Sequence, residues 1–105
     1  MPARFALLGT KQTNIADVAR SVGDALGRTL SLRESSYRGG EYFFNRDSDG
    51  TELSVEQNVR DEEGQYVEPE YSHYRVLVYV NYGNSAIERK VADIPGLHFL
   101  RVETV

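Results

Sequence analysis

The spacing of apolar residues predicts a helix enclosed between two strands at the start of the chain. Arg4–Thr10 is apolar on both alternating faces, as in a central strand. Apolar residues then recur at i, i+3, i+4 and i+7, which is typical of a helix with one buried face. Asn14 is the expected N-cap, and Gly27 stands where a left-handed C-terminal cap belongs. The predicted buried stripe consists of Ile15, Val18, Ala19, Val22, Ala25 and Leu26.

Alternating patterns dominate the middle of the chain. Leu30 and Leu32 alternate with polar residues, which predicts a half-buried strand. Glu41–Arg46 and Thr51–Asn58 are expected to pair as a hairpin around Asp47–Gly50. In the second strand of this hairpin, one side is apolar and the other is predicted to face water. The predicted wet side carries Glu52, Ser54, Glu56 and Asn58.

The end of the chain repeats the pattern of its beginning. Tyr74–Tyr82 reads as a second central strand, and Ser85 to Glu88 form a capping box that starts a short helix. Pro95-Gly96 ends this helix, and Leu97–Val102 supplies a last strand. The predicted order is β-α-β-β-β-β-α-β. Because crossovers are right-handed, we expect a single α+β domain over residues 1–105. It is a two-layer sandwich: a mixed, mostly antiparallel sheet with two helices on one face.

Composition narrows the class of protein. The 105 residues suffice for one hydrophobic core, and the absence of cysteine excludes disulfides and thiolate metal sites. No apolar run reaches membrane-spanning length, and the N-terminus has too short an apolar region for a signal peptide. The sequence therefore predicts a cytoplasmic protein that does not bind membranes.

Negative charge is concentrated in one part of the chain. Residues 47–70 contain nine carboxylates and one arginine, whereas the segments on either side are slightly basic. Because phosphate contact requires a basic face, nucleic acid is not an expected partner. The connection Val59–His73 is longer than usual, and long loops in compact domains are often functional. A solvated acidic loop that only keeps the protein soluble is the alternative.

The stretch Asp61–Tyr74 combines this charge with tyrosines. Tyrosines bury a large area at little entropic cost, and neighbouring carboxylates attract a basic partner. An acidic patch on a small sheet imitates nucleic-acid phosphate. This favours a protein partner with a basic active site, such as a nuclease.

The sequence also contains patterns of three other kinds of site. Asn45 to Glu56 has the spacing of an EF-hand calcium loop, but its flanks are strand-like and Asp-Ser-Asp-Gly is common in hairpins. His73 beside Glu70 has the composition of a general base, without a nucleophile motif nearby. Glu52 and Glu56 share a strand face without any sign of a pocket. The sequence thus predicts no catalytic residues, metal ligands or cofactor.

Three features together resemble the small acidic immunity proteins of bacterial toxin–immunity systems. These are the cysteine-free α+β layout, Tyr-Arg-Gly-Gly-Glu-Tyr-Phe before a hairpin, and Asp-Glu-Glu-Gly…Glu-Pro-Glu-Tyr before a Val/Leu/Tyr strand. The resemblance implies tight binding to a cognate toxin without chemistry of its own. Charge complementarity is then assigned to the carboxylates and anchoring to two tyrosines. The candidate partner-binding residues are Asp61, Glu62, Glu63, Tyr66, Glu68, Glu70 and Tyr71.

Two alternatives to an immunity protein stay open. A small enzyme would have a pocket near His73. An oligomeric structural module would instead form a homodimer through an exposed apolar face, for which the outer side of the strand carrying Tyr42 and Phe44 is the candidate.

Overall fold

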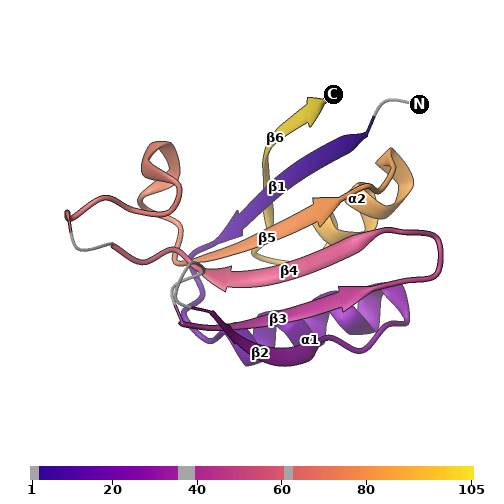
Figure 1. Cartoon of the computed structure of the whole chain (residues 1–105), viewed down its shortest axis with the longest axis horizontal. Coiled ribbons are helices and arrows are strands. Elements are labelled where there is room, and N and C mark those ends of the chain that lie inside the picture. Colours follow the sequence, from indigo (N-terminus) through magenta and orange to yellow (C-terminus); the bar gives the residue numbers. More distant parts are fainter. Residues whose placement is uncertain (1–2, 36–39, 61–62) are drawn as a thin grey trace.

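The structure of the chain, a computed structural model, describes residues 3–35, 40–60 and 63–105. It contains a six-stranded sheet with two helices (Figure 1). The elements in chain order are β1 (Arg4–Thr10), α1 (Ile15–Leu26), β2 (Ser31–Ser35), β3 (Gly40–Arg46), β4 (Glu52–Gln57), the 3-10 turn η2 (Pro69–Tyr71), β5 (Val76–Asn81), α2 (Ser85–Ala92) and β6 (His98–Thr104). The α+β two-layer sandwich and the predicted order of its helices and strands are confirmed.

The strands lie in the order β2-β3-β4-β5-β1-β6, and every described pairing is antiparallel. The sheet is therefore more regular than the mixed sheet that the sequence predicted. Strands joined through a helix do run in the same direction, but other strands separate them. β1 lies between β5 and β6, and three strands lie between β1 and β2. The two strands that each helix joins are therefore not adjacent, and the strands between them pair in antiparallel fashion.

Both helices contribute to a single hydrophobic core on one face of the sheet. Figure 1 shows α1 and α2 behind the strands, on the same side. Val18 and Val22 of α1 and Val91 of α2 belong to one buried cluster. The sheet contributes Ala6, Leu8, Leu53, Val55, Val76, Val78 and Val80 to that cluster. No helix in the described part of the chain has the length and apolar character needed to cross a bilayer.

The caps explain where the helices begin and end. The Asn14 side chain accepts a hydrogen bond from the Asp17 amide at 3.1 Å, and Gly27 ends α1 with a φ of 64°. Both caps were predicted. Ala25, however, is exposed, so it does not belong to the inward stripe. The cap of α2 is Asn84 rather than Ser85, because the Asn84 side chain accepts from the Ile87 amide at 2.9 Å.

Two expectations about side-chain burial are wrong at the edge strand β2 and on β4. Leu32 is 55% exposed, since β2 has a neighbouring strand on one side only. Conversely, Ser54, Glu56 and Asn58 are buried rather than wet. Ser54 donates to Glu56 at 2.6 Å. Ser54 lies between its cross-strand neighbours Phe44 and Tyr79, and Glu56 lies between Tyr42 and Leu77.

Tyr42 and Phe44 lie on β3, whose outer side the sequence predicts as an exposed apolar face. Tyr42 and Phe44 are each half-buried. The Arg33 guanidinium from β2 lies 4.6 Å from the centre of the Phe44 ring. A cation over the aromatic face makes this surface partly polar. More exposed apolar side chains lie elsewhere, for example on β6, at Phe99 and Val102.

The core assignment predicts a contrast between two leucines. Leu53→Ala removes a fully buried side chain from the core and should lower the free energy of unfolding by about 2–5 kcal/mol. Leu32→Ala changes an exposed side chain and should alter it by at most about 0.5 kcal/mol. Urea unfolding of both variants measures the difference. Equal losses would contradict the placement of these two leucines.

Candidate partner-binding site

The connection from Val59 to Arg75 extends beyond the end of the sheet and returns to its open face (Figure 1). Its outer part begins as a continuation of a strand, since Arg60 and Tyr66 form an isolated antiparallel bridge. The Val67 amide donates to the Val59 carbonyl at 3.1 Å. Pro69 then starts the single turn η2, where its fixed φ and missing N–H are tolerated. Hydrogen bonds within the connection thus hold the backbone of its described residues.

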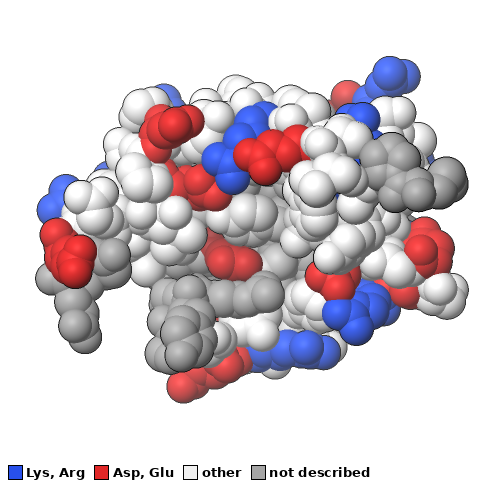
Figure 2. Space-filling view, turned by 45° about the horizontal axis from the view of Figure 1, so that its top comes forward, with Lys and Arg blue, Asp and Glu red and all other residues white. Residues whose placement is uncertain are grey.

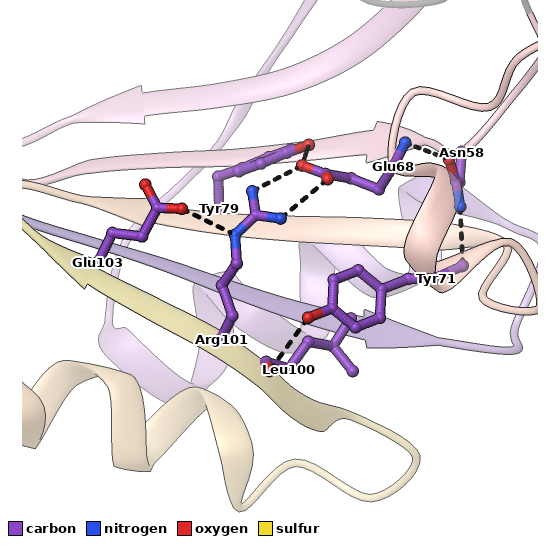
Figure 3. Close-up of polar contacts among 7 residues, drawn as sticks. All are labelled: Asn58, Glu68, Tyr71, Tyr79, Leu100, Arg101 and Glu103. Atoms are coloured by element: carbon purple, nitrogen blue, oxygen red, sulfur yellow. Dashed lines mark hydrogen bonds and ion pairs between the residues drawn. The ribbon is translucent and has the colours of Figure 1, made fainter.

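Glu68 fastens the connection to two strands at once. Its carboxylate accepts two hydrogen bonds from Arg101 of β6, at 2.9 and 3.1 Å, and one from the Tyr79 hydroxyl of β5 at 3.1 Å (Figure 3). The Glu68 side chain is 14% exposed and the Arg101 side chain 35%. Such bidentate, partly buried pairs are among the stronger polar contacts in proteins.

The protonation states of this cluster follow from its geometry. Burial, and then the negative charge of Glu68, raise the pKa of Tyr79, so its phenol is a neutral donor. The hydrogen bonding of the Arg101 guanidinium to Glu68 raises the pKa of Arg101. Glu103 adds a second carboxylate, 3.6 Å from the Arg101 Nε atom. The arginine therefore lies between two acidic groups and stays charged.

Asn58 and two tyrosines complete the attachment. The Asn58 amide group donates to the Tyr71 and Tyr74 carbonyls at 3.0 and 3.1 Å, and its oxygen accepts from the Glu68 amide at 3.1 Å. The Tyr71 hydroxyl donates to the Leu100 carbonyl at 3.4 Å (Figure 3). Leu100 is the extra residue where the register between β1 and β6 shifts. The inner side of the connection is thus bonded to β6 as well as to the end of β4.

Tyr74 packs where β1 has no side chain. A Cβ atom added at Gly9 would lie 2.9 Å from Tyr74 Cγ and 2.9 Å from Leu100 Cδ1. Only glycine therefore admits these two side chains against the central strand.

The structure divides the candidate partner-binding residues into two groups. Glu68 and Tyr71 are half-buried and bonded to the sheet, whereas Glu63 and Glu70 are exposed. Tyr66 is half-buried beneath Arg60, whose guanidinium carbon lies 5.0 Å from the ring centre. Asp61 and Glu62 lie outside the described residues.

A hollow of about 250 Å³ opens beside this attachment, on the face of the sheet without helices. Phe5 and Leu7 give it apolar walls, while Tyr79, Arg101 and Glu103 give it polar ones. Figure 2 shows that acidic and basic side chains alternate around this face rather than separate into fields of one sign. Sequence reasoning missed Arg101 and Asn58. Their only local signal was a polar residue at a strand position facing the open side.

The calcium-loop spacing belongs to the predicted hairpin. Asn45 pairs with the core residue Leu53, whereas Glu56 pairs with Tyr42 three positions further along, so the two side chains point to opposite faces of the sheet. Asp47 and Asp49 pair instead with Arg28, at 3.2 and 3.7 Å. Among the residues that the structure describes, no group of three or more His, Asp or Glu side chains is arranged to hold a metal ion.

The two histidines lie at the surface on either side of Tyr74. The His73 and His98 ring centres are 5.7 and 5.9 Å from that of Tyr74. Both histidines are exposed. Glu52 and Glu56 are the other acidic pair of the sequence. Glu52 accepts a hydrogen bond from Arg46, and Glu56 accepts one from Ser54.

Comparison with known proteins assigns no relationship to the chain. No protein-family model matches it, and no curated protein matches it significantly.

The two groups of carboxylates should differ in their effect on stability. Glu68→Gln removes the charge that holds Arg101 and should lower the free energy of unfolding by about 1–3 kcal/mol. Glu70→Gln changes an exposed carboxylate of the same connection and should have an effect within about 0.5 kcal/mol. Chemical denaturation compares the two. A loss at Glu70 as large as at Glu68 would refute this division.

Proposed function

We propose that this chain is a non-enzymatic binding protein that neutralises a cognate bacterial toxin in the cytoplasm. The toxin would be a protein with a basic active site, such as a nuclease. One observation carries the proposal: the connection Val59–Arg75 is bonded to the sheet on its inner side and leaves Glu63 and Glu70 exposed on its outer side. Glu63 and Glu70 are therefore presented from a structured support.

Structured presentation supports tight binding. Ordering a flexible loop at an interface costs free energy that would otherwise contribute to affinity. Here Glu68, Asn58 and Tyr71 already hold the connection in the free chain. A partner that binds the exposed carboxylates would bear less of that entropic cost.

The charges support a basic partner. Exposed carboxylates accelerate the approach of a positively charged surface and discriminate against acidic ones. The hollow beside Arg101 supplies apolar walls at Phe5 and Leu7, as an anchoring side chain of the partner would require. Glu63 and Glu70 would then steer the toxin, and the hollow would hold one of its side chains.

The polar groups at the attachment support a binding role over catalysis. Glu68, Arg101 and Tyr79 satisfy one another through hydrogen bonds. A general acid or base needs a lone pair or proton directed at substrate.

The test combines a gene neighbour with charge reversal. Immunity genes usually lie directly downstream of their toxin genes, so the product of the adjacent open reading frame is the ligand to titrate. We expect one-to-one binding and loss of toxin activity. The double variant Glu63→Lys/Glu70→Lys should bind about tenfold more weakly, or about 1.4 kcal/mol, with a weaker dependence on salt.

Asp24→Lys/Glu34→Lys is the matched control, because it reverses two exposed carboxylates on α1 and β2. Its affinity should be unchanged. If the adjacent product has no toxic activity that this chain inhibits, the proposed function is wrong. If both double variants bind like the native chain, the assignment of Glu63 and Glu70 is wrong.

A further inference from the structure

Two arginines lie beside one tyrosine where the connection leaves the sheet. Arg60, Tyr66 and Arg75 line one groove, and the guanidinium carbon of Arg60 lies 5.0 Å from the centre of the Tyr66 ring. The backbone fixes all three positions. Arg60 and Tyr66 face each other in the isolated bridge, and the Arg75 amide donates to the Thr10 carbonyl at 2.8 Å. The two guanidinium groups are thus held near each other by the fold.

No carboxylate compensates these two charges within the described ranges. Neither Arg60 nor Arg75 forms an ion pair there. Five of the other described arginines do pair with carboxylates, namely Arg4, Arg20, Arg28, Arg46 and Arg101. Like charges held close together destabilise each other, and an anion between them removes that cost.

The pKa of Tyr66 responds to the positive potential of these two arginines. The hydrogen bond and charge of Arg60, with a smaller contribution from Arg75, lower the pKa of Tyr66. A phenol near two cations ionises more readily because they stabilise its anion. The Tyr66 oxygen is a weak acceptor for two guanidinium groups, so a true anion would bind them better.

These side chains line a groove of about 340 Å³. Thr13, Gln57 and Asn58 complete its polar wall, and no acidic residue of the described chain lines it. Thr13 directly precedes Asn14, the N-cap of α1, so the positive end of the helix dipole lies beside the groove. The one acidic residue in the first turn of α1, Asp17, is exposed and lies 4.0 Å from Arg20.

We propose that the groove between Arg60, Tyr66 and Arg75 binds a phosphate group, either as inorganic phosphate or as the phosphate of a nucleotide. A phosphate dianion balances two guanidinium charges, and its oxygens match their planar forks of N–H donors. The volume exceeds what one phosphate needs, since a water molecule occupies about 30 Å³ in the liquid. The remaining space accommodates part of a nucleoside. This site is separate from toxin binding by Glu63 and Glu70, and either can fail without the other.

Calorimetry at low ionic strength with inorganic phosphate and with adenosine monophosphate tests the site. We expect one phosphate group bound per chain. Arg60→Gln and Arg75→Gln should each weaken binding about tenfold, equivalent to about 1.4 kcal/mol. Arg20→Gln, which removes an exposed arginine on α1, should leave the affinity unchanged. Tighter binding of the nucleotide identifies it as the source of the phosphate, and equal affinities identify free phosphate.

Tyrosinate absorbance during an alkaline titration locates the bound anion. The difference between the native chain and Tyr66→Phe isolates Tyr66 from the other tyrosines. Phosphate should raise the pKa of Tyr66, because the bound anion cancels the cationic charge that lowers it.

Three results would overturn the phosphate site. The first is that neither ligand binds at low ionic strength. The second is that binding is insensitive to Arg60→Gln and Arg75→Gln, although thermal unfolding shows both variants folded. The third is that phosphate binds while the Tyr66 titration stays unchanged, since the anion then lies elsewhere.

Discussion

The contact between Glu68 and Arg101 determines how this chain presents its longest connection. The two residues are 33 positions apart, and their bidentate pair joins the connection to the edge strand β6. Tyr79 of β5 adds a third hydrogen bond to the same carboxylate. Partly buried ion pairs often add little net stability because desolvation offsets their attraction. Their effect here is on position, because Glu68, Asn58 and Tyr71 together bond the connection to β6 and to the end of β4.

That constraint divides an acidic sequence into parts with different physical roles. A carboxylate bonded to arginine contributes little to the outside field, because the pair is nearly neutral at a distance. Glu70, two residues later, is exposed and keeps its full effect on an approaching charge. The net charge of the segment thus overstates the charge that a partner would meet. The surface in Figure 2, where both signs alternate, reflects the same neutralisation by neighbouring arginines.

Periodicity predicted most of the fold, because burial against one core determines it. The stripe of α1 and the doubly apolar strands β1 and β5 could be recognised without any knowledge of their neighbours. The predictions of burial failed where the neighbouring strands determine whether a side chain is covered. Leu32 has the spacing of a buried residue but lies on an edge strand, and Ser54 is polar but is flanked by aromatic side chains. At α2, Asn84 and Ser85 are both good N-caps, and sequence spacing alone selected the wrong one.

The candidate site could be predicted only in part, for the same reason. The number of carboxylates points to this segment, but it cannot separate Glu68 from Glu70, because the arginine that distinguishes them is distant in sequence. Nor could it reveal that the basic residue at the start of the segment, Arg60, lines the same groove as Arg75 at its end. The connection therefore carries both signs of charge in separate places: exposed carboxylates on its outer side, and two guanidinium groups at its base. If the connection imitates nucleic-acid phosphate for a toxin, the imitation depends on the positions of a few exposed carboxylates. The number of carboxylates in the sequence does not give those positions.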